Sequence, residues 1–309
     1  MNILTAKVTY PQESSTVRPA LSARSDGWWT VMAWRGNSHS DNLSAATVNL
    51  KNDLEPKRVD SNTSKVAPAL TFFRNQWWMA WIGDDGESSI NIGRLRFGPN
   101  AESPEIVDQH KTANTSLLAP ALASSGDAIY LAWIGRDATG RINIARSTDG
   151  LTFTKHIFDA YTSTRAPALA YNQGRLYLAY TAGNDRITMV EFDDPTTVVP
   201  TLVKELDQST SFEPSLAPYG RYVAVGWTGQ DGGNKLNVAE YHPSPAPALE
   251  ANATYEDSAS TGPSIASRLI LQDPHSNVPP QQQLVIAWTG TDGAGTLNVA
   301  TSRQQDSHQ

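Results

Sequence analysis

A small group of residues with binding chemistry recurs along this chain at fixed spacing. Each complete copy has a Trp, a Gly two positions later, an Asp two positions after the Gly, and an Asn six positions after the Asp. The complete copies are Trp81, Gly83, Asp85 and Asn91; Trp133, Gly135, Asp137 and Asn143; Trp227, Gly229, Asp231 and Asn237; and Trp288, Gly290, Asp292 and Asn298. Two copies vary the pattern, as Tyr180, Asn184 or Asp185, and Thr188, and as Trp34, Gly36, Ser38 and Ser44.

Together these residue types suit the recognition of a sugar. An indole face packs against the apolar C–H face of a pyranose ring, while carboxylate and amide groups exchange hydrogen bonds with its hydroxyls. We therefore predict that the Trp, Asp and Asn of the complete copies bind a ligand, together with Trp34, Tyr180 and Asp185 of the variant copies. Several weak sites on one molecule would bind a glycan-coated surface with avidity.

Each member of the group also has a purely structural interpretation. The Trp ends an apolar run and could serve only to pack one sheet against the next, as for Trp133. An Asp before Gly is favoured in hairpin turns for backbone reasons, which applies to Asp85, Asp231 and Asp292. The Asn lies between apolar neighbours and must be hydrogen-bonded, either to an adjacent repeat or to a ligand. The residues alone leave both interpretations open.

The elements that must position these residues belong to a longer repeat. A segment of the type Pro-Ala-Leu or a close variant occurs six times, with its prolines at Pro19, Pro68, Pro120, Pro167, Pro214 and Pro263. After each proline come an apolar run that ends in the aromatic residue, a polar turn, a third run such as LNVA, and a weaker fourth run. Short β-branched and aromatic runs separated by Gly, Asp and Pro predict antiparallel strands joined by hairpins.

Each repeat is thus expected to form a four-stranded sheet, which must stack on its neighbours to bury both faces. We predict a single all-β domain over residues 1–309, a six-bladed β-propeller whose repeats start near residues 18, 67, 119, 166, 213 and 262. The last repeat stops after its third strand, while the chain begins with an extra strand over residues 2–10. This N-terminal strand is expected to complete the last blade and close the ring.

One segment carries a resemblance to a known family. The stretch STDGLTF, from Ser147 to Phe153, looks like a degenerate Asp-box, the turn between the third and fourth strands of sialidase-like propeller blades. The repeated Ala-Pro-Ala-Leu, Leu-Ala-Trp-x-Gly-x-Asp and Leu-Asn-Val-Ala pattern resembles bacterial propeller proteins of this sialidase-like type and, in architecture, the multivalent propeller lectins. The resemblance implies the propeller fold over nearly the whole chain, whereas the Asp-box itself implies only a structural turn.

The same resemblance raises an enzymatic alternative. Sialidases clamp a carboxylate with three arginines and use a Tyr nucleophile with an acid/base Asp. Arg18 and Arg165, each near a repeat proline, are the nearest approximations to that arginine cradle. A single axial active site requires different residues from different blades, and this chain keeps its repeats similar. We therefore favour a protein without catalytic residues, and keep a sialidase-type glycosidase as the alternative.

Composition narrows the remaining classes. The formal charge is −7 and the Lys and Arg residues are scattered, so we expect no nucleic-acid partner. There is no Cys, and the six His residues lack metal-ligand spacing, so we predict neither a metal site nor a cofactor. The start, MNILTAKVTYPQ, lacks the apolar core of a secretion signal and no apolar stretch is long enough to span a membrane. We expect a soluble chain, cytoplasmic or released by a non-classical route; oligomeric state stays open.

The sequence therefore predicts a lectin with repeated glycan sites between blades and no catalysis. A protein-interaction scaffold is a further alternative, acting through one propeller face, with the insertion around residues 274–280 of the last repeat as a candidate contact. One local asymmetry singles out a groove. The pairs Trp28-Trp29 and Trp77-Trp78 occur in adjacent repeats only, and strand alternation sends the two members of each pair to opposite faces. If the outward members meet between blades 1 and 2, that groove is a preferred site.

Overall fold

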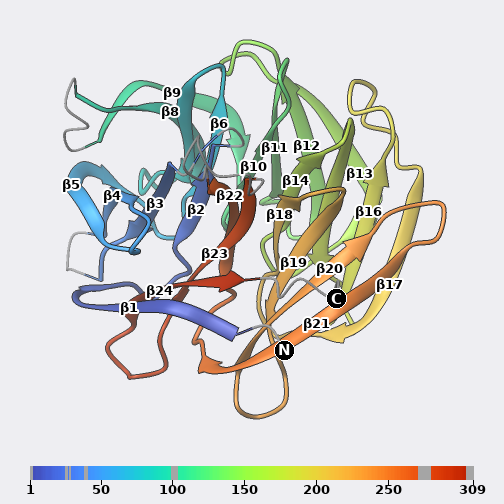
Figure 1. The fold of residues 1–309 in the computed structure, drawn as a ribbon. Coiled ribbons are helices and arrows are strands. Elements are labelled where there is room, and N and C mark those ends of the chain that lie inside the picture. Colours follow the sequence, from blue (N-terminus) through green and yellow to red (C-terminus); the bar gives the residue numbers. More distant parts are fainter. Residues whose placement is uncertain are drawn as a thin grey trace.

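A computed structural model describes residues 3–24, 27, 29–37, 41–98, 104–270 and 280–303. Over these residues the chain forms six antiparallel sheets of four strands each, arranged as blades around a central axis (Figure 1). The prediction of an all-β, six-bladed propeller is confirmed. Within the described ranges no helix is long and apolar enough to cross a membrane. Trp28, Ser38 and the insertion at 271–279 lie outside the described residues.

The first three blades follow each other along the chain, and each runs from the inner strand at the axis to the outer strand. Blade 1 consists of β2 (Ala20–Ala23), β3 (Thr30–Arg35), β4 (Asn42–Val48) and β5 (Leu54–Thr63). Blade 2 consists of β6 (Ala69–Phe73), β7 (Gln76–Ile82), β8 (Ser89–Arg96) and β9 (Glu105–Thr115). Blade 3 consists of β10 (Ala121–Ser124), β11 (Ile129–Ile134), β12 (Arg141–Ser147) and β13 (Thr154–Thr162).

The last three blades complete the ring. Blade 4 consists of β14 (Ala168–Asn172), β15 (Arg175–Thr181), β16 (Arg186–Phe192) and β17 (Leu202–Ser209). Blade 5 consists of β18 (Ser215–Tyr219), β19 (Tyr222–Thr228), β20 (Lys235–His242) and β21 (Ala248–Ser258). Blade 6 consists of β22 (Ser264–Ile270), β23 (Gln281–Thr289), β24 (Thr296–Arg303) and β1 (Ile3–Ser14).

The N-terminal strand closes the ring as predicted. β1 pairs antiparallel with β24, and its register runs from Ile3 opposite Arg303 to Ser14 opposite Thr296. In Figure 1 the blue N-terminal strand lies beside the red C-terminal one. Just after β1, the backbone N–H of Ser15 donates to the carbonyl of Gly295 at 2.9 Å. The two ends of the chain therefore share one blade, in which β1 covers the edge of β24.

The hydrophobic core is divided among the boundaries between blades. Inner strands begin just after the repeat prolines, where the missing N–H of proline is tolerated. Six clusters of buried residues each join two neighbouring blades, and each cluster contains one of the repeated aromatic residues: Trp34, Trp81, Trp133, Tyr180, Trp227 and Trp288. Each of these aromatic side chains packs against the blade that comes before its own blade in the propeller. The repeat therefore encodes blade stacking.

The segment that resembles an Asp-box forms the turn between β12 and β13. The Asp149 carboxylate accepts hydrogen bonds from the Ser147 hydroxyl (2.8 Å) and from the N–H groups of Leu151 (2.8 Å) and Thr152 (2.7 Å), which holds the pKa of Asp149 below its usual range. Gly150 has a φ of +80°, and a Cβ there would lie 2.3 Å from the ring of Trp78 in blade 2. The turn therefore also packs against its neighbour.

Candidate functional site

The repeated aromatic and polar residues face each other across two strands of each blade. Trp34 lies opposite Ser44, Trp81 opposite Asn91, Trp133 opposite Asn143, Tyr180 opposite Thr188, Trp227 opposite Asn237, and Trp288 opposite Asn298. The Gly between them leaves room for the amide, because a Cβ on Gly83 would lie 2.7 Å from Nδ2 of Asn91. The spacing seen in the sequence therefore reflects a cross-strand unit.

The aromatic rings of this unit are buried. The exposed fraction of Trp34, Trp81, Trp133, Trp227 and Trp288 is 2% or less, and that of Tyr180 is 6%. Because the rings are this deeply buried, a ring in this conformation offers little of its surface to a ligand. Packing is thus the role that the geometry gives directly, and a binding role for the rings stays a prediction.

The asparagine amides are held within their own blades. Each Nδ2 donates to the backbone oxygen two residues earlier, at 2.9–3.2 Å, in Asn91, Asn143, Asn237 and Asn298. In blades 5 and 6 the amide oxygen is also engaged, because Asn237 accepts from Thr254 and Asn298 accepts from Thr9 on the outer strand. In blade 3 the residue opposite Asn143 on the outer strand is Ile157, which has no hydroxyl to donate.

The aspartates of the unit shape the turns that follow the aromatic residues. One oxygen accepts backbone N–H groups two to four residues ahead, at 2.9–3.2 Å, in Asp85, Asp137, Asp231 and Asp292. This Asx-turn geometry agrees with the structural interpretation. The hydroxyl of Thr139 also donates to Asp137 and holds the pKa of that carboxyl below its usual range. Asp185 of the variant copy instead accepts from the Gln230 side chain at 3.1 Å.

Asp85 has an ion-pair partner, which leads to a prediction. Nζ of Lys111 lies 2.9 Å from its carboxylate, and chiefly this hydrogen bond lowers the pKa of Asp85 from 3.8 to about 2. Because the folded pKa is depressed, the stability from this pair is complete above pH 3.8 and lost as the pH falls towards 2. NMR should find the Asp85 carboxyl titrating near pH 2, and nearer 3.8 in Lys111→Met. A carboxyl that titrates near 3.8 in the unchanged protein would contradict the pair.

One complete copy of the predicted group borders a cavity between blades 2 and 3. Trp133, Asp137 and Asn143 line it, and residues 113–115 of the outer strand β9 in blade 2 form the facing wall. Its volume is about 210 Å³. Pockets that enclose drug-sized ligands measure ~300–1,000 Å³, so this smaller cavity suits a single sugar ring or less. Here the structure brings together residues that the sequence analysis grouped.

Several lining residues of this cavity lay outside the predicted group, and three of them bear on its chemistry. Arg136 donates from Nη1 to the backbone oxygen of Glu87 in blade 2, at 2.8 Å. Ile157 is 54% exposed, which is high for an aliphatic side chain in a strand. Nζ of Lys155 lies 5.2 Å from the ring centroid of Trp133. Lys155 could have been found from the sequence, because the weak fourth run contains a Lys in several repeats.

The lysine on the outer strand has different partners in blades 1, 3 and 6. In blade 1, Lys57 lies over Trp34 and pairs with Glu13. In blade 6, Lys7 lies over Trp288 and pairs with Asp257. Lys155 is exposed, and no described carboxylate lies within 4.0 Å of its Nζ. The ammonium group in blade 3 is therefore neither neutralised nor tethered by a neighbouring acid in the described part of the chain.

A second cavity, of about 340 Å³, lies between blades 1 and 2. Trp29 and Trp77 both line it, so one member of each Trp pair borders this cavity, and whether both act as outward-facing binding residues stays a prediction. Phe72 packs on Trp77 with ring centroids 4.8 Å apart, and Phe97 contacts Trp29 at 5.5 Å. Trp78, by contrast, packs into the cluster between blades 2 and 3. Aromatic and basic side chains, the latter from Arg24, Arg94 and Arg96, thus share the lining of this groove.

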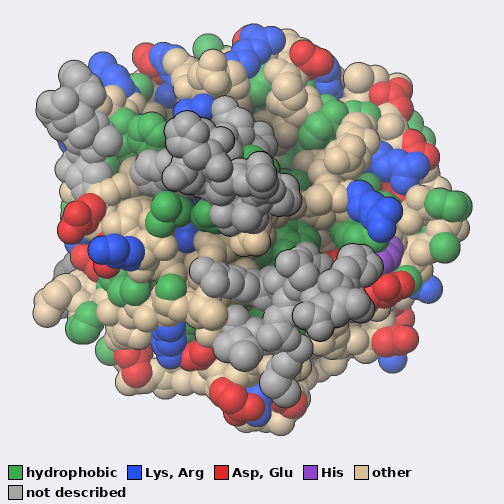
Figure 2. Space-filling view, viewed as in Figure 1, with side chains coloured by type: hydrophobic (Ala, Val, Ile, Leu, Met, Phe, Trp, Pro, Cys, Tyr) green, Lys and Arg blue, Asp and Glu red, His purple; other side chains and the backbone are tan. Residues whose placement is uncertain are grey.

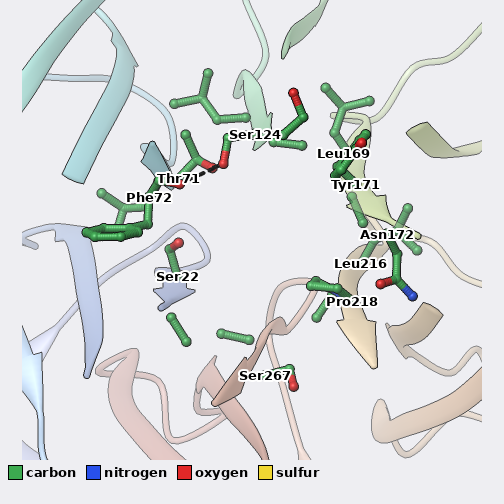
Figure 3. Close-up of a pocket in the computed structure, with 18 of the residues that line it drawn as sticks. Ser22, Thr71, Phe72, Ser124, Leu169, Tyr171, Asn172, Leu216, Pro218 and Ser267 are labelled. Carbon is green, nitrogen blue, oxygen red and sulfur yellow. Dashed lines mark hydrogen bonds between the residues drawn. The ribbon is translucent and has the colours of Figure 1, made fainter. Parts of the chain in front are cut away.

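The propeller axis contains a wider channel, about 580 Å³, lined by the inner strands of all six blades. Figure 3 looks into it, with Phe72 and Tyr171 on different sides of the open centre and the Thr71 hydroxyl hydrogen-bonded to Ser124 at 3.0 Å. A ring of aliphatic residues separates it from a narrow space of about 60 Å³: Leu21, Leu70, Leu122, Leu169, Leu216 and Ile265. The channel is therefore constricted part-way along the axis.

The two arginines of the enzymatic alternative do not converge on this channel. Arg18 is buried beside the narrow space, where Nη1 donates to the carbonyl of Pro214 at 2.8 Å and Nε lies 3.8 Å from Glu213. Burial lowers the pKa of Arg18. Arg165 is exposed in the loop before β14 and lines neither axial cavity. In the described part of the chain, Arg18 therefore ties blade 1 to blade 5 across the axis.

Charged side chains do not form a large basic surface on the face in Figure 2. Lys and Arg are interspersed with Asp and Glu around its perimeter. Elsewhere among the described residues charges are often paired, for example Arg96 with Glu105 at 2.7 Å and Lys65 with Asp84 at 2.7 Å. This pattern on one face agrees with the acidic net charge of −7.

Comparisons with known proteins find likeness in fold. No protein-family model matches the chain, and no curated protein matches it in sequence. Among solved structures, the Aleuria aurantia lectin in complex with α-methyl-L-fucoside is 14% identical, with 93% of this chain and 92% of that chain covered and a TM-score of 0.60. A triple-arginine mutant of AofleA from Arthrobotrys oligospora is 8% identical, covering 96% and 86%, with a TM-score of 0.65.

A viral protein has a similar fold. The N11 neuraminidase-like protein of influenza A/flat-faced bat/Peru is 12% identical, with 99% of this chain and 95% of that chain covered and a TM-score of 0.58. At such low identity these likenesses establish the fold alone. The chain thus resembles both fungal propeller lectins and neuraminidase-like proteins, and the choice between them depends on the residues of the cavities.

Proposed function

We propose that this protein binds saccharides without covalent chemistry in pockets between neighbouring blades, and that the cavity between blades 2 and 3 is the principal site. The observation that carries the proposal is that Trp133, Asp137 and Asn143, grouped from the sequence, border one cavity together with the exposed Ile157. The likeness in fold to propeller lectins, one of them described with α-methyl-L-fucoside, supports the same class of function.

Polar and apolar groups of the cavity divide the recognition of a sugar between them. The amide oxygen of Asn143 and the second carboxylate oxygen of Asp137 would accept hydrogen bonds from hydroxyls, because neither oxygen has a donor among the described residues. Ile157 would contact the C–H face of the ring. The untethered Lys155 can move away from Trp133 and uncover part of the indole, which lets that ring join the contact.

Repetition would supply avidity. The aromatic groove between blades 1 and 2, with Trp29 and Trp77, is a second candidate pocket in this proposal. The corresponding groups of the other blades, which include Asn91, Asn237 and Asn298, stay predicted sites. Two pockets on one rigid ring raise the effective concentration at a surface that displays many glycans.

A glycan array with purified protein tests the proposal, with α-methyl-L-fucoside competition as its first arm. We expect at least one class of saccharide to bind. We expect Asn143→Ala to lower the apparent affinity for that saccharide about tenfold, because the hydrogen bond to the amide is lost and the sugar hydroxyl is left without its partner. Asn237→Ala is the matched comparison: the amide oxygen of Asn237 is already bonded to Thr254, so we expect this variant to lower the affinity less than Asn143→Ala does. A thermal melt confirms that each variant is folded.

A second variant keeps the test decisive if Asn143→Ala does not fold. Ala113 is exposed on β9 and lines the cavity from the blade 2 side, so Ala113→Trp should fill it without disturbing the core. We expect this variant to lose the array signal while melting near the temperature of the unchanged protein. An array that stays silent with and without calcium would overturn the proposed function.

A further inference from the structure

The charge of the cavity between blades 2 and 3 differs from that of the molecule. The chain carries a net −7, yet two of the described residues that line this cavity, Arg136 and Lys155, are basic and have no carboxylate partner among the described residues. The carboxylate of Asp137 uses one oxygen for its own turn, and the positive charge of Arg141 contributes to the lowered pKa of Asp137. Charges in a small, partly enclosed volume of this kind are screened less than on an open surface.

The lysine is what sets blade 3 apart. In blades 1 and 6 the corresponding ammonium groups of Lys57 and Lys7 are neutralised by Glu13 and Asp257. Lys155 has no carboxylate within 4.0 Å among the described residues, although it keeps the same position over a Trp ring. An ammonium group left without a protein counter-ion beside a cavity is placed to pair with an anion from outside.

Arg136, in the turn between β11 and β12 of the same blade, points to the same conclusion. Its hydrogen bond to blade 2 goes to a neutral carbonyl, that of Glu87, and this bond does not compensate the positive charge of the guanidinium. The guanidinium has five donors in a planar fork, and one bond to a carbonyl leaves most of them for a ligand. Lys155 and Arg136 therefore border one space in which Asn143 and Ile157 can hold a sugar ring.

We infer that the saccharide bound between blades 2 and 3 carries an acidic group, a carboxylate or a sulfate, which pairs with Lys155 and Arg136. This inference rests on the proposed function, and it names the class of ligand for the same site. The sugar ring lies against Ile157 and the edge of Trp133, and its hydroxyls reach the amide oxygen of Asn143. Neutral saccharides fit the same space and lack the ion pairs.

The test compares pyranosides that carry or lack an acidic group. Galactose and glucose are each presented as the neutral sugar, as the uronic acid and as the 6-sulfate, and fucose, which has a methyl group at C6, is presented as the neutral sugar and as a sulfate ester. We expect an acidic form to bind about fivefold tighter than its neutral parent at low salt. The preference should vanish near 1 M salt, where the screening length is about 3 Å. The carboxylate and sulfate arms identify which anion the cavity takes.

Two variants locate the effect. Lys155→Gln should remove most of the acid preference, measured as the ratio of the affinities for the acidic and the neutral form of one sugar, whereas Lys57→Gln, at the corresponding place over Trp34, should keep that ratio. Equal binding of acidic and neutral forms, or an acid preference that survives Lys155→Gln, would overturn the inference and leave the proposed function standing. Absence of binding by every sugar, neutral and acidic, would instead overturn the proposed function itself.

Discussion

Trp133→Ala is expected to lower the free energy of unfolding by about 3–5 kcal/mol, the cost of truncating a large buried side chain. The ring is 1% exposed and packs in the cluster that joins blades 2 and 3, together with Ile129 and Leu131. Deleting it leaves a void that the flat faces of two sheets cannot close by a small shift. Denaturant unfolding, followed by circular dichroism, measures the change.

Trp133→Phe is the matched variant, because it keeps an aromatic ring in the same cluster. We expect it to cost less than half as much as the alanine variant, since most of the apolar contact remains. A loss below about 1 kcal/mol for Trp133→Ala would contradict the packing role, since most truncations of buried large side chains cost more. It would mean that the indole is available to stack on a ligand with its face, as the sequence analysis predicted.

Gly295→Ala should lower the free energy of unfolding by about 2–4 kcal/mol, because it adds strain at positive φ and a clash with the backbone where the propeller closes. Gly295 has a φ of +69°, and a Cβ there would lie 2.2 Å from the carbonyl oxygen of Ser15. Ser15 follows β1 and donates its N–H to the carbonyl of Gly295. A methyl group at this position therefore forces apart the two ends of the chain.

Gly293→Ala, two residues away in the same turn, separates strain from collision. Its φ is +76°, but nothing lies within 4 Å of a Cβ placed on it. We expect a loss of about 1 kcal/mol, the cost of positive φ alone. Thermal unfolding of both variants measures the difference. Equal losses for Gly293→Ala and Gly295→Ala would contradict the tight contact between β1 and β24 that closes the propeller.

The architecture could be predicted because each structural feature of a blade occurs several times in the sequence. The interval is nearly constant for the proline that starts an inner strand and for the Trp and Asn that lie opposite each other. The extra strand at the start of the chain indicated how the propeller closes. Cross-strand register also followed, because a hairpin with a short turn brings Trp133 opposite Asn143. These features depend on local spacing, which the sequence contains.

The role of individual side chains could not be predicted, because it depends on contacts between distant repeats. Alternation places Trp133 on one face of its strand, but both faces of a blade are covered by neighbours, so alternation alone does not separate core from pocket. Arg18 looked like a substrate clamp until its partner, Pro214, was found 196 residues away. The difference between Lys155 and Lys57 depends on Glu13, which comes from β1.

The central claim is that a saccharide occupies the cavity between blades 2 and 3. A crystal structure of the protein with the best ligand from the array tests it most directly. We predict density for a sugar ring against Ile157, within hydrogen-bond distance of the Asn143 amide oxygen, and with any acidic group beside Lys155. Density for the sugar in the axial channel next to Phe72 and Tyr171, with the cavity between blades 2 and 3 holding only solvent, would contradict the claim.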